Sequence, residues 1–325
     1  MKKVTLRITV ALGIILSMAA GVSAQDSMRK MLKKTFGDLT FEAKADTTFF
    51  QTDVRRQATG LNFFYRRVDL SLPLFQDERQ EWSLGGKFGA TELDTRARLP
   101  DTGGRLPNEL WDLGLWTAYR RKIDNGWIAG GSLSFGSPSD KPFASRHEME
   151  TAANGFLRIP HGQSDAWVAM LNWSNNREFA PGIPLPGLAY EFNRGRDLQA
   201  LVGLPFSSVR WRVDERWTLS ASYLVPRTVH AKATYALTEK LKAFVAYDWQ
   251  NRRWFRHDRR DHEDRLFYYE MNATSGVEWE ISKQASLVVA AGYGFQRMLF
   301  EGDRNDNRIN LADSPLVSLN LVLSF

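Results

Sequence analysis

The chain has 325 residues, of which 43% are hydrophobic, 25% are charged and none is a cysteine. This composition excludes a disordered chain, a collagen, a disulfide scaffold and any site built on a thiolate. The net charge is +6, and three of the basic residues lie in the first 24 positions, so no large field of one sign favours nucleic-acid binding.

Residues 1–24 have the pattern of a secretory signal peptide. Lys2, Lys3 and Arg7 form a basic start, an apolar stretch follows over 10–20, and the small residues of 22–24 suit a cleavage site. The apolar stretch is too short for a membrane-spanning helix, and a genuine N-terminal helix is the less favoured alternative. We expect residues 25–37 to form a short basic arm in the periplasm and 38–325 to form a single domain.

Apolar and polar side chains alternate along most of this domain. In 111–119 and 127–135 the odd positions are mostly bulky and apolar, and Asp124-Asn125-Gly126 between them is typical of a tight hairpin. Because successive side chains of a strand point to opposite faces, each segment has one apolar face and one small or charged face. No run of 18 uncharged apolar residues follows the signal peptide, so no transmembrane helix is predicted.

The alternation predicts sixteen strands. They cover 39–50, 60–74, 81–92, 109–121, 127–136, 148–159, 165–173, 188–193, 198–204, 207–213, 217–225, 228–237, 241–255, 265–281, 285–300 and 315–325. The three segments in 188–213 are shorter than the roughly 9–11 residues that a membrane-spanning strand needs. Fourteen or twelve strands therefore remain open alternatives.

Three features favour a membrane barrel over a soluble periplasmic sandwich. Bulky aromatic residues gather near one end of the predicted strands, as in the girdle at a membrane interface. They are Trp82, Tyr119, Trp127, Trp167, Trp217, Tyr235 and Trp279. The connections alternate between short turns and longer loops, which is typical of short periplasmic turns and longer extracellular loops. The chain also ends in an alternating strand, 319–325, that finishes on Phe325.

This last strand, together with the signal peptide, resembles bacterial outer-membrane β-barrel proteins. The segments 185–190 and 204–211 are similar to uncharacterised porin-like barrels with no assigned substrate. The resemblance implies an all-β, closed antiparallel transmembrane β-barrel in the outer membrane. It also implies that Phe325 is the signal read by the barrel-assembly machinery, and that outer-membrane lipids and lipopolysaccharide are partners.

Charged residues on the polar faces would line the lumen of such a barrel. The basic set is Arg210, Arg212, Lys232 and Lys242, and the acidic set is Glu270, Glu278 and Glu280. If the two sets face each other, they create a transverse field that selects solutes. The alternative interpretation is that inner-wall charges neutralise one another in salt bridges.

The segment 251–265 is the densest charge cluster and is predicted to be an outer loop. Its candidate contacts to lipopolysaccharide phosphates or an anionic solute are Arg252, Arg253, Arg256, Arg259 and Arg260. The alternative is a solvated loop, balanced by its own acids and histidines. His257 and His262 lack the spacing of a metal site, and 303–314 lacks the glycine and glutamate of a calcium loop. No metal or cofactor is predicted.

Catalysis is not expected. His161 and Ser164 stand three residues apart in a predicted turn, and His147 with Ser145 lacks a third group to orient the imidazole. The leading hypothesis is a porin-like channel for passive diffusion of small hydrophilic solutes, because fourteen to sixteen strands can leave an aqueous channel. The alternatives are a non-conducting structural or adhesive barrel and, less favoured, a lipid-modifying barrel enzyme. The pattern leaves solute specificity and oligomeric state open.

Overall fold

The computed structural model describes residues 35–100, 102–177, 179–302 and 307–325. The predicted signal peptide and residues 25–34 of the predicted arm lie outside the described residues. The described part forms a single sheet of seventeen strands and two short 3-10 turns, η1 (Asp124–Gly126) and η2 (Arg146–Glu148). None of these described residues belongs to a helix long and apolar enough to cross a bilayer.

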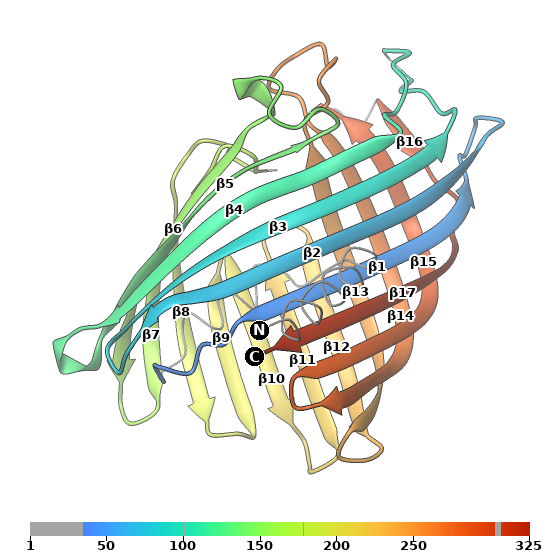
Figure 1. The fold of residues 1–325 in the computed structure, drawn as a ribbon. Coiled ribbons are helices and arrows are strands. Elements are labelled where there is room, and N and C mark those ends of the chain that lie inside the picture. The colour runs from blue at the N-terminus through green and yellow to red at the C-terminus, as the bar shows by residue number, and fades with distance from the viewer. Residues whose placement is uncertain (1–34, 101, 178, 303–306) are drawn as a thin grey trace, which may run out of the picture.

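The sheet closes on itself (Figure 1). Neighbouring strands run antiparallel, and the last strand pairs with the first, from Glu42 opposite Ser324 to Phe50 opposite Leu316. Within the described residues, sixteen strands form the barrel, and β16 (Arg308–Asn310) is a small addition against β15. The predicted all-β closed antiparallel barrel of sixteen strands is confirmed, as is the resemblance to outer-membrane β-barrels at the level of fold. The alternative predictions of fourteen or twelve strands and of a soluble periplasmic sandwich are wrong.

The barrel strands follow the order of the chain. They are β1 (Glu42–Asp53), β2 (Gly60–Gln76), β3 (Gln80–Thr95), β4 (Glu109–Lys122), β5 (Ile128–Ser139), β6 (Glu150–His161), β7 (Asp165–Ser174), β8 (Leu185–Arg194), β9 (Leu198–Leu204), β10 (Phe206–Arg212), β11 (Trp217–Leu224), β12 (Thr228–Ala236), β13 (Leu241–Trp254), β14 (Leu266–Ser282), β15 (Ala285–Glu301) and β17 (Ser314–Ser324). Both the start of β1 and the end of β17 lie at the end with short turns, which we call the turn end; the other is the loop end.

The seam between the first and last strands reaches the last residue of the chain. The backbone N–H of Phe325 donates to the carbonyl of Phe41 at 2.9 Å, and Phe41 N–H donates back to Phe325 at 3.1 Å. The two rings lie 6.3 Å apart. The aromatic C-terminal residue therefore takes part in closing the barrel.

The outer face of the barrel is apolar in a band around the molecule. Leu115, Leu133, Val202 and Val245 are 59–66% exposed on this face. The predicted girdle residues also lie outside, next to the short turns: six of the seven are 38–49% exposed, and Tyr235 packs on Trp217 at 5.0 Å. A monomeric soluble protein rarely exposes so continuous an apolar surface.

The hairpin predicted at 124–126 is present between β4 and β5. Asn125 and Gly126 both have positive φ angles, 67° and 76°, which is the backbone that a tight turn of twisted strands requires. The turn is closed by the Ile123 N–H, which donates to the carbonyl of Trp127 at 2.7 Å.

The wall of the barrel is much lower on one side. Strands β9 to β12 have seven to nine residues, whereas β2, β14 and β15 have seventeen. At about 3.3 Å per residue, β9 is about 23 Å long and β14 about 56 Å. We call β9–β12 the low wall; it is yellow in Figure 1. It ends in the short connections at 205 and 225–227, so it does not project above an apolar band about 25 Å tall.

The loop end of the interior contains a packed apolar core, which the sequence analysis did not predict. This loop-end core consists of Phe50, Val54, Leu61, Phe63, Tyr65, Leu93, Ala97, Leu99, Leu106, Leu110, Trp254, Leu266, Tyr268, Leu299, Ile309, Leu311 and Leu316. Phe63 stacks on Phe50 at 4.6 Å and on Tyr268 at 5.0 Å, so β2 and β14 meet through their inner faces. The core fills the loop end beside β1–β4 and β13–β15, the side away from the low wall.

Candidate functional site: the barrel interior

A strip of polar side chains follows the inner face of β12, β13 and β14. From the turn end it carries Lys242 with Glu278, then Lys232, then His230 with Asp248. Lys232 Nζ lies 2.9 Å and Lys242 Nζ 3.7 Å from the Glu278 carboxylate, and His230 bonds to Asp248. The side chains of Lys242 and His230 are 36% and 40% exposed. Solvent therefore reaches this polar strip from Lys242 at the turn end to His230 on β12, the last strand of the low wall.

The opposite inner wall also carries paired charges. Arg67 bonds to Asp69 at 2.6 Å and Lys87 to Asp112 at 2.7 Å. Further along the wall, Arg158 bonds to Glu191 at 2.5 Å. These pairs agree with the alternative interpretation, in which inner-wall charges neutralise one another.

The hypothesis of opposed basic and acidic faces is wrong. Lys232 and Lys242 share Glu278 on adjacent strands instead of facing it across the lumen. Glu270 lies apart, buried in the loop half, where Tyr268 Oη donates to it at 2.9 Å. Glu280 also faces inward from β14 but lies at the turn end. Alternation shows on which face of a strand a residue lies but not its position along the barrel axis. The relative positions of the basic and acidic sets could therefore not be predicted.

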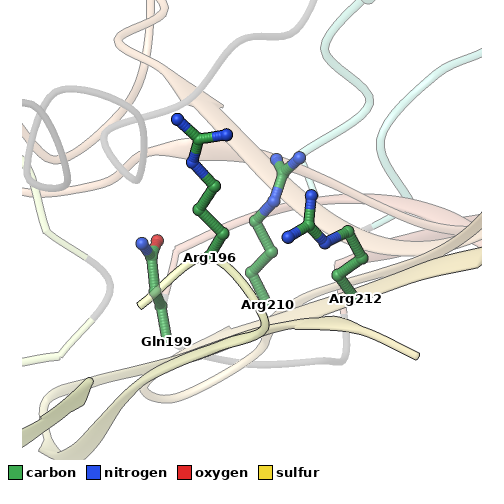
Figure 2. A pocket seen from close by; sticks show the side chains of 4 residues that line it. All are labelled: Arg196, Gln199, Arg210 and Arg212. Atoms are coloured by element: carbon green, nitrogen blue, oxygen red, sulfur yellow. The ribbon is translucent and has the colours of Figure 1, made fainter. Parts of the chain in front are cut away.

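Arginines gather at the turn end of the low wall. Arg196 in the β8–β9 turn, Gln199 on β9, and Arg210 and Arg212 on β10 line a cavity of about 230 Å³ (Figure 2). Arg212 Nη2 also lies 2.8 Å from Asp197 Oδ1. The cavity lining has three guanidinium groups and no carboxylate. We call this the arginine cavity. Alternation predicts Arg210 and Arg212 as lumen residues, whereas Arg196 lies in a turn, where alternation assigns no face.

The inner face of β5–β10 is apolar next to this cavity. This apolar inner wall consists of Ile128, Phe156, Val168, Met170, Ala189, Leu201 and Phe206, with Leu224 and Phe36 packed against it. Alternation does not predict this wall, but one sequence signal exists for it. Residues 166–171 are apolar without interruption, so β7 is apolar on both faces.

Residues 35–37 lie against the inner wall at the turn end. Arg120 Nη2 donates to the Thr35 carbonyl at 2.7 Å, and its guanidinium lies 4.2 Å from the centre of the Phe36 ring. The Gly37 N–H donates to Glu81 Oε1 at 2.8 Å. The only described residues of the predicted arm therefore bind to the barrel itself.

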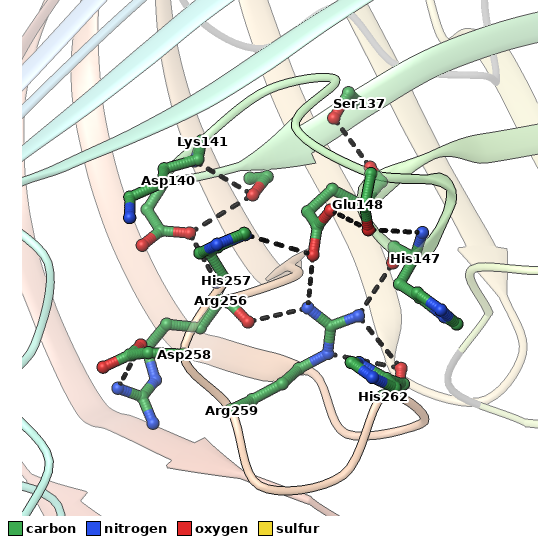
Figure 3. A network of polar contacts seen from close by, with 12 residues as sticks. Ser137, Asp140, Lys141, His147, Glu148, Arg256, His257, Asp258, Arg259 and His262 are labelled. Carbon is green, nitrogen blue, oxygen red and sulfur yellow. Dashed lines mark hydrogen bonds and ion pairs between the residues drawn. The ribbon is translucent and has the colours of Figure 1, made fainter.

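Three loops are joined at the loop end by buried ionic contacts. Glu148 Oε2 accepts from Ser145 Oγ at 2.6 Å and its Oε1 from Arg259 at 3.2 Å, with both charged side chains almost fully buried (Figure 3). Arg256 binds the Glu301 carboxylate with two nitrogens, at 2.7 and 3.0 Å. Arg265 Nε donates to Asn176 at 3.1 Å. We call the Glu148–Arg259 contact the loop latch.

These contacts correct the prediction for segment 251–265. Arg256 and Arg259 are buried in ion pairs, and Arg252 lies inside the barrel, 3.8 Å from the centre of the Tyr65 ring. These three residues cannot reach lipopolysaccharide. Arg260 is exposed and Arg253 is only partly buried. Glu148 and Glu301, which bind Arg259 and Arg256, come from distant parts of the chain, and the local sequence gives no sign of them. Asp258 is a local acid that also binds Arg256, at 2.7 Å.

The candidate histidines are engaged in other contacts. The His262 ring stacks on His147 at 3.9 Å, and His161 Nδ1 bonds to Tyr190 Oη at 3.0 Å. Ser145 donates to a carboxylate, not to an imidazole. The described ranges hold no group of three or more His, Asp or Glu side chains that could bind a metal ion. Asp303–Asn305 of the calcium-like segment lies outside the described residues.

The environment of His147 favours its neutral form. Burial lowers the pKa of His147, and positive charge on His262, Arg146 and Arg259 lowers it further, against the opposing effect of Glu148. Because the pKa of His147 is lowered in the folded protein, its neutral form stabilises the closed loops at a pH above its ordinary pKa of 6.5. This stabilisation is lost as the pH falls through the lowered pKa.

Glu148 does not lose its charge in the same pH range. Burial alone would raise its pKa, but hydrogen bonds from Ser145 and Arg259 and the charges of Arg259 and His257 hold the pKa of Glu148 below its ordinary 4.5. The contribution of Glu148 is present above that value and is lost only at lower pH. Of these two groups, His147 is therefore the first to change its charge as the pH falls.

We expect acidification from pH 8 to pH 5 to loosen segment 256–264. The measurement is amide hydrogen exchange, corrected for the intrinsic rate at each pH. His147→Phe keeps a ring on His262 but cannot be protonated, so its loop should stay protected at pH 5. Equal protection of the parent protein at both pH values would contradict this prediction.

The comparisons with known proteins give a family model and distant barrels. The model described as "Domain of unknown function (DUF6268)" matches residues 197–314, which include the low wall and segment 255–265. The COG4313 outer membrane channel from Pseudomonas putida F1 is 10% identical, with 90% of this chain and 98% of that chain covered and a TM-score of 0.40. No curated protein matches the chain.

Two further solved barrels show similar values. The TodX monoaromatic hydrocarbon channel, in a deletion mutant, is 11% identical over 88% of this chain and 90% of its own, with a TM-score of 0.41. The translocator domain of the autotransporter NalP from Neisseria meningitidis is 11% identical over 93% and 96%, with a TM-score of 0.33.

Proposed function

We propose that this protein is a porin-like channel for passive diffusion of small hydrophilic solutes across the bacterial outer membrane. The observation that carries the proposal is the polar strip, which stays solvent-accessible from Lys242 at the turn end to His230 near the low wall. A wall of paired charges presents polar atoms to water and solutes along its whole length.

The low wall gives this strip an exit. The loop-end core and the loop latch occupy the loop end beside β1–β5 and β13–β15. Strands β11 and β12 stop at 225–227, so the strip reaches the rim of the low wall without passing through the core. The proposed solute path therefore runs along the polar strip on β12–β14 and leaves the barrel over the low wall.

The location and partners of the barrel follow from the same proposal. The apolar outer band and the girdle around Trp82 and Trp217 suit an outer-membrane bilayer. Arg253 and Arg260 are the remaining candidates for lipopolysaccharide contacts, and Phe325 at the seam is the candidate signal for the assembly machinery. We propose no catalytic role, because the Ser145 hydroxyl and the His161 ring are bonded to Glu148 and Tyr190.

The deciding experiment is the conductance of the refolded, signal-free protein in a planar lipid bilayer. We expect steady single-channel steps, which Ala246→Trp should reduce because Ala246 faces the lumen opposite Lys232. Ala243→Trp is the matched control on the lipid side of the same strand and should leave the steps unchanged. A well-folded barrel without current would overturn the channel.

A non-conducting structural barrel is the second candidate. It is favoured by the loop-end core, because a packed apolar core inside the loop end is more than a barrel wall requires. The two candidates differ in the same bilayer measurement. Only the channel predicts that a bulky side chain on the polar strip changes the current.

A further inference from the structure

Residues 96–106 form a hairpin beyond the loop ends of β3 and β4, which we call the outer hairpin. The Leu99 N–H donates to the Gly104 carbonyl at 2.9 Å, and the Leu106 N–H donates to the Ala97 carbonyl at 3.4 Å. The side chains of Ala97, Leu99 and Leu106 belong to the loop-end core and are at most 4% exposed. The underside of the outer hairpin is therefore packed on the barrel, which holds its other face in place.

The other face of the outer hairpin carries three exposed arginines. Arg98 and Arg105 stand directly opposite each other in an antiparallel bridge, and Arg96 lies on the same face as Arg98. None of the three forms an ion pair with a carboxylate in the described part of the chain, to which Asp101 at the hairpin tip does not belong. Arg98 Nη1 donates instead to the Gly103 carbonyl at 2.8 Å. We call Arg96, Arg98 and Arg105 the arginine face.

The acids below the arginine face on the same side of the barrel have partners within the protein. Glu92 forms an ion pair with Arg66, and Asn62 donates to Asp94 at 3.1 Å. An exposed arginine is ordinarily hydrated and needs no partner, but like charges at directly opposite positions of paired strands are destabilising. An anion that lies between the guanidinium groups of the arginine face removes this repulsion.

The arginine face continues the outer side of β3 beyond the apolar band. Phe88, which is 49% exposed, is the last bulky apolar residue on that side of β3. The distance from Phe88 to Arg96 is about 26 Å along the strand, which corresponds to about 20 Å along the barrel axis at a strand tilt of about 40°. The polar headgroup region of a bilayer leaflet is only about 5–8 Å thick. The arginine face therefore lies beyond the lipid headgroups.

We propose that the arginine face binds a saccharide that bears phosphate or carboxylate groups, namely the core region of the surrounding lipopolysaccharide. Planar guanidinium groups bind both kinds of anion with paired hydrogen bonds. The arginine face points sideways from the wall at a level beyond the headgroups, where the saccharides of neighbouring lipopolysaccharide molecules lie. The proposal rests on the outer-membrane location of the proposed channel. It names a contact surface outside segment 251–265, in which Arg256 and Arg259 are buried.

The test is the affinity of the immobilised, signal-free, refolded barrel for lipopolysaccharide in a non-ionic detergent. The two probes are lipopolysaccharide with a complete phosphorylated core, and lipid A, which has the headgroup phosphates but no core. The triple variant Arg96→Gln/Arg98→Gln/Arg105→Gln should weaken binding of the complete molecule about tenfold. It should leave the affinity for lipid A unchanged, because the headgroup phosphates do not reach the arginine face.

A matched control removes three exposed cations near the other end of the same two strands. Arg79→Gln/Arg121→Gln/Lys122→Gln changes the net charge equally at the turn end and should leave both affinities unchanged. Equal weakening by the two triple variants would reveal an effect of net charge alone and would overturn the proposal. Weaker binding of lipid A by the first variant would overturn it as well, because the headgroup would then be the ligand.

Conductance separates this proposal from the channel itself. A barrel that conducts, but whose variant at Arg96, Arg98 and Arg105 binds lipopolysaccharide like the parent protein, overturns the proposal and leaves the channel in place. A barrel that carries no current, but whose binding of the complete molecule depends on these three arginines as expected, supports the contact surface and overturns the channel.

Discussion

Arg259→Met is expected to release segment 255–265 from the loop that carries Glu148. Both side chains of the loop latch are almost fully buried, and removal of one partner of a buried ion pair costs about 3–5 kcal/mol because the other charge is left without compensation. The loops avoid this unfavourable free energy if they open, because the charge of Glu148 is then hydrated. Protection of residues 256–264 against hydrogen exchange should therefore fall by a factor of the order of 100.

The neighbouring arginine gives a matched control. Arg260 is exposed, so Arg260→Met removes the same charge from the same loop and should change protection little. The double variant Glu148→Gln/Arg259→Met removes the buried charge as well and should recover part of the protection. An equal loss in the Arg259 and Arg260 variants would show that the latch does not hold the loop.

The barrel itself could be predicted because its determinants are local. Alternation assigns each residue of a strand to one of two faces, and turn residues such as Asn125 and Gly126 mark the hairpins. Even the short segments in 188–213, which left the strand number open, are separate strands β8, β9 and β10. The shortness of β9 and β10 is itself a structural feature, since these strands form part of the low wall.

What fills the barrel could not be predicted in the same way. Phe63 and Tyr268 meet although β2 and β14 are not neighbours in the sheet, and this contact is not encoded in the pattern of either strand. Arg259 binds Glu148, which lies more than a hundred residues earlier in the chain. The charge-rich segment 251–265 therefore predicts a solvent-facing or lipopolysaccharide-facing loop, although Arg256, Arg259 and Arg265 are buried.

Phe63→Ala is expected to lower the free energy of unfolding by about 3–5 kcal/mol. Phe63 is 1% exposed between Phe50 and Tyr268, and loss of a buried aromatic ring leaves a cavity that packed neighbours fill only in part. Denaturant unfolding of the refolded barrel measures the change. Phe64→Ala, the next residue on the outer face, should cost less, because Phe64 is only partly buried and contacts Phe49 at the edge of its ring.

The same variant separates two roles of the loop-end core. If the core serves stability and solutes pass along the polar strip instead, Phe63→Ala should keep the single-channel conductance of the parent protein while it loses stability. A core that acts as a removable plug predicts the reverse, a higher conductance with little change in unfolding. Because the core joins the loop-end parts of β1–β4 and β13–β15, whereas the polar strip lies nearer the turn end and reaches the low wall at β12, we expect the first result.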